Sequence, residues 1–458
     1  MRVVLWCALL GLSALPLSAL NVDDAVAEAL KANLGLQAEA KRLNALERDK
    51  TWAVQKLFPS LSAGFGWQRW NDTANQRRLL GLTPQFTGGS LTGLSADVYN
   101  PDPQSLGAVV DVQLTLSLAT FAAMDKTLVD WDAGRLNYEQ ASRRLVHDVK
   151  AAFYRLLTLR ESAALAARQV TIAQNRLTQV EASYKSGTAP ELSLLQARVG
   201  LESRRNDQRA SDTALRQASY AFSLLLGRPP AADLDPQGTI EPPLPAAVDG
   251  AAWAGRYAEG RNDIRALDTQ TRLLDVETSQ VVAMALPQVV VDWNADPALN
   301  DPAHNSAYTP SNWSQTNGAL SLQLQWKLDP FLPGSQFWTL SADLADQKQA
   351  LRRNRAQAID AARAQILSIA DQLEQAASSL PSLESNARDA RRAADLAQIA
   401  FAAGVQGLLD TQDADVQAQG AELGLLNARL ALQLAWLDLE DATETPLKTL
   451  MEVPHETH

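Results

Sequence analysis

Residues 110–118 read Val-Asp-Val-Gln-Leu-Thr-Leu-Ser-Leu, with an apolar residue at every second position. Side chains of a β-strand point alternately to its two faces, so this stretch predicts a strand with one apolar and one polar face. Three further stretches alternate in the same way, and only Val290 breaks the pattern. We expect strands at about 60–70, 109–118, 287–295 and 319–328. Each is close to the ~9–11 residues of a tilted strand that crosses a bilayer.

The polar faces of these strands suit a water-filled lumen. Aromatic residues lie near the strand ends, as they do at the two edges of a membrane barrel. These residues are Trp67, Trp70, Trp293, Trp326 and Phe331. Alternation also fits a soluble β-sandwich, but four isolated strands between very long helices would make a poor one. Four strands cannot close a barrel, so we expect an oligomer: about eight strands from a dimer, whose interior side chains would fill, or about twelve from a trimer.

The helical segments are unusually long. We expect long helices at 121–184 and 335–403, each followed by a shorter one, at 190–227 and 407–442. A helix of residues 121–184 would extend roughly 96 Å, more than a compact domain can hold. Such patterns indicate coiled-coil-like helices. Pro381 interrupts the second long segment and predicts either a kinked helix or two helices.

The chain is two copies of one pattern: helix, strand, long polar loop, strand, long helix, glycine turn and helix. Proline fits where a helix gives way to a strand, and glycine fits a left-handed position that ends a helix. The helix-to-strand prolines are Pro59 and Pro287, and the helix-turn glycines are Gly187 and Gly404. The predicted division is a first structural repeat at 20–245, a second at 246–445 and a C-terminal tail at 446–458.

The first 19 residues predict a secretory signal peptide. Arg2 precedes an apolar run that ends in Ser18-Ala19, so we expect cleavage after Ala19. The alternative is a buried N-terminal helix. Cys7, the only cysteine, leaves with the signal, and its early position argues against an acyl anchor. No later stretch holds the ~18 apolar residues of a membrane helix.

Charge and composition exclude several classes of protein. The 52 acidic and 41 basic residues give a net charge of −11, which disfavours binding to nucleic acid. A single cysteine excludes a disulfide framework and a thiolate zinc site, and the four histidines are scattered. Nucleotide-binding and hydrolase motifs are missing from the sequence. We therefore expect no metal, no cofactor and no enzymatic activity.

Several short motifs occur in a fixed order. They are Leu-Phe-Pro-Ser-Leu-Ser at 57–62, Tyr-Lys-Ser-Gly at 184–187, Leu-Gln-Ala at 195–197, Leu-Leu-Leu-Gly-Arg-Pro-Pro at 224–230 and Leu-Asp-Thr-Gln at 409–412. Their order and duplication resemble the TolC-like outer-membrane efflux protein family, also called outer membrane factors. The resemblance extends from Leu20 to about Thr445.

This resemblance implies a mainly α fold with membrane β-structure. Three chains would form one twelve-stranded β-barrel in the outer membrane and one α-barrel of very long helices in the periplasm. The homotrimer would be the exit duct of a tripartite efflux or type I secretion system. It would conduct substrates passively from the periplasm to the exterior, together with a periplasmic adaptor and an inner-membrane transporter.

Two other classes of protein fit parts of the sequence. An exported coiled-coil structural or adhesin-like protein explains the signal and the long helices, but not the four alternating strands. A periplasmic adaptor would have one helical hairpin flanked by separate β-domains, not two complete repeats. The efflux duct is therefore the favoured interpretation.

The resemblance also identifies a periplasmic entrance near the two glycine turns. Of the family's acidic ring, only Asp410 has a counterpart here, and Asp413 follows one helical turn later. The family's tyrosine falls at Phe401 and its base at Gln406. The acidic position of the first tip falls at Ser193 and the other ring carboxylate at Gly407, which leaves the usual closing linkage incomplete. We expect Asp410 and Asp413 to form a cation-attracting ring at the pore entrance; the alternative is two solvated surface carboxylates.

Overall fold

A computed structural model describes residues 20–69, 104–231, 234–245, 247–300, 306–313 and 318–452. The expected signal peptide, Trp70 and most of the first polar loop lie outside these residues. The chain divides into two compact units. The first comprises residues 1–45, 133–268 and 352–458, and the second comprises 46–132 and 269–351. Each unit therefore contains residues from both predicted repeats.

The helices are close to those expected. They are α1 (Val22–Ala32), α2 (Leu34–Thr51), α4 (Leu118–Lys185), α5 (Glu191–Leu225), α6 (Gly250–Tyr257), α7 (Asn262–Ala283), α8 (Gln336–Ala402), α9 (Leu408–Thr443) and α10 (Leu447–Glu452), with short 3₁₀ turns η1 (Ala53–Leu57), η2 (Ala258–Gly260), η3 (Pro310–Asn312) and η4 (Asp329–Phe331). At the start of α1 the Asn21 side chain accepts the backbone N–H of Asp24 at 2.8 Å, which satisfies one free donor of the first turn.

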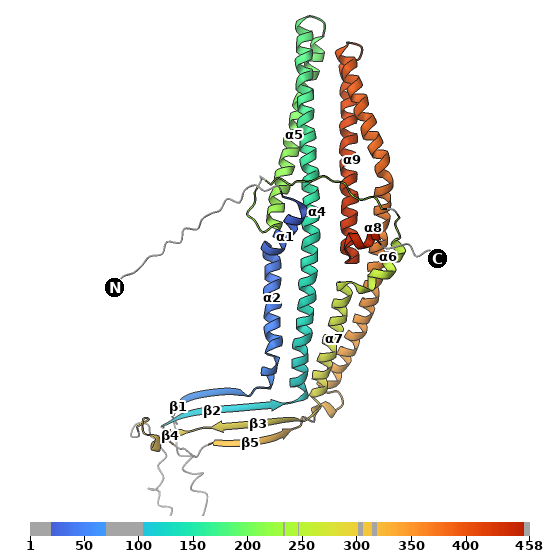
Figure 1. Cartoon of the computed structure of the whole chain (residues 1–458). Coiled ribbons are helices and arrows are strands. Elements are labelled where there is room, and N and C mark those ends of the chain that lie inside the picture. The colour runs from blue at the N-terminus through green and yellow to red at the C-terminus, as the bar shows by residue number, and fades with distance from the viewer. Residues whose placement is uncertain are drawn as a thin grey trace, which may run out of the picture. The chain divides into compact units, whose positions relative to one another are not determined.

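Two antiparallel hairpins, α4 with α5 and α8 with α9, form most of the first unit (Figure 1). Both long helices end in the same way. Gly187 and Gly404 have φ values of 77° and 75°, the left-handed region that glycine enters without strain. The backbone N–H of Thr188 reaches the carbonyl of Ser183, and that of Val405 reaches the carbonyl of Ala400, each at 2.9 Å. These bonds satisfy the last carbonyls of each helix.

The structure adds two details to the second repeat. The helix α8 runs without a break across Pro381, so the two-helix alternative is wrong. The tail expected from residue 446 onward contains a helix, α10, because Leu450 is buried in an apolar cluster with Trp436 and Ile366.

The first unit has two equivalent cores. One joins α1, α4 and α5 around Phe153 and Phe222. The other joins α6, α8 and α9 around Trp253, Ile366 and Trp436. The corresponding helices of the two repeats thus bury the same kinds of face. The duplication seen in the sequence is a duplication of packing.

The second unit holds one antiparallel sheet in the order β1-β2-β3-β5, seen side by side in Figure 1. Its strands are β1 (Ser60–Arg69), β2 (Gln104–Leu116), β3 (Gln288–Ala295) and β5 (Gly318–Gln325). A fifth, three-residue strand, β4 (Ala298–Asn300), pairs with β2 inside what we expected to be a loop. Pro59 and Pro287 directly precede β1 and β3.

Strand boundaries differ from expectation at both ends of β2 and at the end of β5. β2 begins at Gln104 rather than 109 and stops at Leu116, and Leu118 is the first residue of α4. The reason is Ser117, whose hydroxyl accepts the backbone N–H of Thr120 at 3.3 Å and so caps the helix. β5 ends at Gln325, because the next residues turn into η4 with Pro330.

The register separates two rows of side chains. Leu116, Val289 and Leu324 lie opposite one another on one face. The adjacent row on the other face is Thr115, Val290 and Gln323. The apolar row continues along β5, where Leu322 is 75% exposed, whereas Val290 is 4% exposed. The one residue that breaks the alternation is therefore buried. Among the described residues, no helix combines the length and apolar character needed to cross a membrane.

Candidate functional site: the seam between the helical hairpins

The two hairpins meet close to their glycine turns in an apolar group that we call the tip cluster. Its buried members come from α4, α5 and α9. They are Leu177, Val180, Leu194, Ala197, Leu201 and Leu408. Phe401, at the position where the family resemblance places a tyrosine, packs against this cluster. Phe401 has no hydroxyl group for a hydrogen bond, but it contributes apolar packing at this position.

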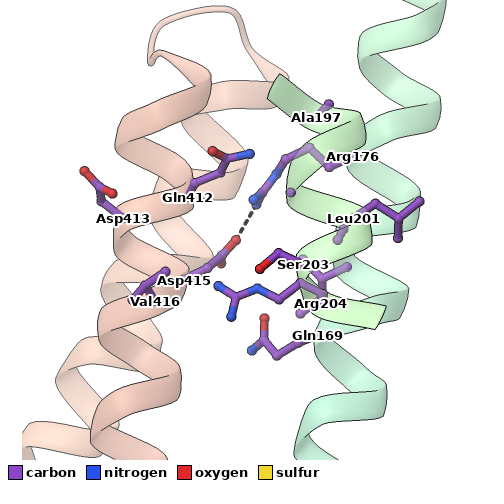
Figure 2. Close-up of a pocket in the computed structure, with 13 residues that line it drawn as sticks. Gln169, Arg176, Ala197, Leu201, Ser203, Arg204, Gln412, Asp413, Asp415 and Val416 are labelled. Carbon is purple, nitrogen blue, oxygen red and sulfur yellow. Dashed lines mark ion pairs between the residues drawn. The ribbon is translucent and has the colours of Figure 1, made fainter. Parts of the chain in front are cut away.

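A buried ion pair lies beside the tip cluster. Arg176 on α4 places its Nη2 2.6 Å from Oδ2 of Asp415 on α9, and the two side chains are only 6% and 12% exposed. Figure 2 marks this pair with a dashed line between the two hairpins. In the protein interior a charge pair is screened far less than at the surface. This contact therefore ties α4 directly to α9.

Further polar contacts join the hairpins at the same level. Nη2 of Arg176 also donates to Oε1 of Gln398 on α8 at 2.5 Å. Arg204 on α5 donates to Gln419 on α9 at 2.7 Å. A Cβ on Gly200 would lie 3.2 Å from the amide nitrogen of Gln412, so glycine there lets α9 approach α5 closely. We call the Arg176, Asp415, Gln398, Arg204 and Gln419 contacts together the hairpin seam.

The seam borders a cavity of about 330 Å³ between α4, α5 and α9. Gln169, Ser203, Gln412 and both arginines supply polar lining (Figure 2). Nε of Arg176 is buried and has no hydrogen-bond partner among the described residues. The described residues thus leave this buried donor unsatisfied.

The expected entrance residues lie nearby but outside the seam. Asp410 and Asp413 are both exposed on α9, one turn apart. Asp410 is in the first turn of α9, and the N-cap residue, Gly407, makes no side-chain hydrogen bond. The negative charge of Asp410 is favourable there because the helix dipole is positive at its N-terminus. In Figure 2 Asp413 lies on the far side of α9 from Arg176. Ser193 and Gln406 are half-buried near the turns. A role of Asp410 and Asp413 in the pore remains a prediction.

The periodicity of α9 contains a sequence signal for one seam residue. The buried positions at the start of α9 are Leu408, Thr411, Asp415 and Ala418, which follow the 3.6-residue helical period. Asp415 is thus a carboxylate on an apolar stripe. Asp410 and Asp413 lie off that stripe, as expected for exposed residues. The partner, Arg176, could not be identified from spacing because it lies on a distant helix.

A second polar contact between α4 and α9 centres on His147. Its Nε2 lies 2.8 Å from Asp438, and its Nδ1 lies 3.3 Å from Asp148. The hydrogen bond to Asp438 chiefly raises the pKa of His147 from 6.5 to about 9, although burial opposes the shift. Lys150 pairs with Glu440 at 3.0 Å, and Arg143 pairs with Glu444. The raised pKa favours the protonated form of His147, so its contact with Asp438 is an interhelical ion pair.

Within the described residues, no group of three or more potential ligands could hold a metal ion. The arrangement offers interhelical links rather than a reaction centre. What the seam can do physically is hold two hairpins together or, when its contacts break, release them.

Comparisons with known proteins agree with this fold. Residues 25–228 match the family described as Outer membrane efflux protein. A comparison with curated protein sequences found no match. The fold resembles the outer membrane channel CmeC of Campylobacter jejuni (TM-score 0.73, 12% identity, covering 94% of this chain and 88% of that chain). It also resembles the outer membrane protein VceC of Vibrio cholerae (0.69, 15%, 93% and 96%) and the open MtrE outer membrane channel of Neisseria gonorrhoeae (0.68, 18%, 93% and 89%).

These findings define the class of fold: long helical hairpins with an antiparallel sheet, as in the outer membrane channels CmeC and MtrE. The resemblance expected from the sequence is confirmed: residues 25–228 match the model of the outer membrane efflux protein family, and the chain has the fold of the outer membrane protein VceC. The expected fold class, very long helices together with four strands, agrees with both findings.

Proposed function

We propose that this protein is the outer-membrane exit duct of a tripartite efflux or type I secretion system. It conducts substrates passively from the periplasm to the exterior. The family match and the shared fold favour this function over an exported structural or adhesin-like protein. The duct carries out no chemistry of its own, so we propose no enzymatic role.

The single observation that carries the proposal is the sheet. Its outer apolar row is exposed on β1 and β5, where Leu61, Phe65, Leu320, Leu322 and Leu324 are each more than 70% exposed. Exposed leucines in such a row suit contact with lipid. β1 and β5 are also the two ends of the strand order among the described strands. Open edges are not tolerated in lipid, so the edges must pair with other copies.

Three copies are proposed because the family resemblance implies a trimer. Four long strands from each chain then give about twelve, enough to enclose a lumen. The helices support a ring of copies as well. Exposed apolar residues follow one stripe on α5, at Leu192, Leu195 and Val199, and another on α8, at Leu396 and Ile399. Such stripes suit burial against the helices of a neighbouring copy.

The partners proposed are a periplasmic adaptor and an inner-membrane transporter. A passive duct has no energy source of its own, so directed transport requires an energised partner. The hairpin seam is proposed to hold the periplasmic end in its resting arrangement. The family's usual closing linkage cannot form here, because its positions are occupied by Phe401, Gln406 and Ser193. We propose that two contacts replace it: the packing of Phe401 on the tip cluster and the ion pair of Arg176 with Asp415.

Cysteine cross-linking between the sheet edges tests this proposal. Cys7 is the only native cysteine and lies in the expected signal peptide, so engineered cysteines would react alone. Single cysteines at Leu61, Ala63 or Phe65 would be combined with single cysteines at Leu320, Leu322 or Leu324. Oxidation in membranes should give a covalent ladder that stops at three chains. A ladder that stops at two would contradict the trimer, and no ladder for any pair would contradict closure through these edges.

A further inference from the structure

The helical hairpins of the two repeats correspond at a constant separation of 217 residues. The glycines of the two helix turns, Gly187 and Gly404, are 217 residues apart. So are Gly227 and Glu444, which follow α5 and α9 in the left-handed conformation. Fully buried residues keep the same separation, as in Val149 with Ile366 and Leu156 with Leu373. Each position of α4 and α5 therefore has a defined counterpart in α8 and α9.

One interface between the repeats lies within the chain, where α4 of the first repeat packs on α9 of the second. Three ion pairs cross this interface: Arg176 with Asp415, His147 with Asp438, and Lys150 with Glu440. The counterparts of α4 and α9 are α8 and α5. The burial of α8 and α5 therefore shows whether the chain also completes the equivalent second interface.

The surface on α5 is uncovered where the equivalent surface on α9 is covered. Leu437 of α9 is 5% exposed and borders a cavity that His147 of α4 also lines. Its counterpart on α5, Tyr220, is 41% exposed. The first residues of α7 and α2 differ in the same way, since Asn262 is 2% exposed and Leu34 is 75% exposed. These two residues are 228 positions apart, like the two helix-to-strand prolines.

The matching surface on α8 is uncovered as well. Ala151 and Arg176 of α4 are both buried. Their counterparts on α8, Ser368 and Ala393, are both exposed. The chain thus contains one complete interface between repeats and the two uncovered halves of an equivalent one.

We propose that α8 of one copy packs on α5 and the start of α2 of the next copy, in the arrangement that α4 has on α9 within a chain. The partner is a second copy of this chain, because the two uncovered surfaces are the counterparts of two surfaces that already fit each other. Contacts between two different surfaces lead to a closed ring or to an open filament. The duct requires the ring, and in that respect the inference rests on the proposed function.

The interface between copies differs in chemistry from the one within the chain. The counterparts of the three ion pairs carry no opposite charges: they are Ala393 with Arg198, Ala364 with Ala221, and Leu367 with Ser223. The exposed side chains of Leu34, Tyr220 and Leu367 would instead supply apolar area. At these positions salt cannot weaken the ring, since there is no ion pair to screen.

Cysteine cross-linking between the helices tests the pairing. Ala221 and Ala364 are exposed, and they are the counterparts of Asp438 and His147, whose side chains lie 2.8 Å apart. In membranes, the full-length protein with Ala221→Cys and Ala364→Cys should form a covalent ladder of chains with a short bifunctional thiol reagent. Either substitution alone should give no cross-link, because each surface meets a different one.

The matched control combines Ala221→Cys with Ser382→Cys. Ser382 is exposed on the same face of α8 as Ala364, but it lies five helical turns, or about 27 Å, further along. A short reagent should not join these two positions.

Three outcomes would overturn the proposal. A cross-link from Ala221→Cys alone would place α5 against α5. Equal cross-linking by the control would show that the contact is not specific. A missing ladder for Ala221→Cys with Ala364→Cys, while the cysteines at the sheet edges still form theirs, would refute the helix pairing and leave the proposed function untouched. Loss of both ladders would instead contradict the ring itself.

Discussion

Loss of the carboxylate at Asp415 should loosen the hairpin seam locally. In Asp415→Asn the guanidinium of Arg176 stays buried without a counter-charge. Removing one partner of a buried pair costs about 3–5 kcal/mol. We expect the lower end of that range, because asparagine can still accept one hydrogen bond from Arg176 and both side chains keep a little exposure, 6% and 12%.

Hydrogen exchange of backbone amides in the full-length protein measures this cost where it arises. About 3 kcal/mol of lost local stability corresponds to roughly 100-fold faster exchange in the segments around Arg176 and Asp415. The matched control is Glu202→Gln. It breaks an exposed pair with Arg205 in which the side chains are 59% and 42% exposed. Exposed pairs contribute about 0–1 kcal/mol, so exchange there should rise about fivefold at most.

The double variant Arg176→Met with Asp415→Leu separates the pair from its surroundings. Both new side chains would extend the tip cluster, and apolar replacement of a buried ion pair is often neutral. Exchange should therefore return close to the wild-type rate. If amide exchange in Asp415→Asn were no faster than in the Glu202→Gln control, the pair would not hold the hairpins together. The same would follow if exchange in the double variant were as fast as in Asp415→Asn.

Three further outcomes are expected. Leu324→Arg, in the exposed row, should cost about 2–4 kcal/mol of membrane insertion, whereas Gln323→Arg should insert normally; equal damage in a membrane fractionation assay would contradict the assignment of the two faces. The stabilisation from His147, whose pKa is raised to about 9, should be complete below pH 6.5 and lost as the pH rises through 9. The thermal midpoint of the wild type should then approach that of His147→Gln at alkaline pH, and a constant difference would refute the ion pair. Asp410→Asn with Asp413→Asn should abolish block of channel current by multivalent cations from the periplasmic side; unchanged block would place both carboxylates outside the pore.

The sequence predicted the parts of the fold that depend on local pattern. Alternation identified the four long strands, and the glycines at 187 and 404 identified the helix ends because their left-handed conformation is a local requirement. The end of β2 was missed because the alternation continues through Ser117, which instead caps α4. β4 was missed because three residues carry too little pattern and pair only through β2.

The candidate site was only partly predictable. The sequence predicted a functional site near the glycine turns. The residues it indicated, through the family resemblance, were Asp410 and Asp413. The pair of Arg176 and Asp415 joins helices more than 200 residues apart in the chain, and no local spacing connects them. The same holds for His147 and Asp438, whose separation of 291 residues hides the contact that sets the charge of the histidine.

Single-channel recording in a planar lipid bilayer tests the channel function most directly. The purified full-length protein should produce discrete conductance steps, and the Asp415→Asn variant should produce larger or more frequent ones because its hairpin seam is weakened. If both proteins are shown to be inserted in the bilayer and neither produces any step, this chain does not form a conducting duct.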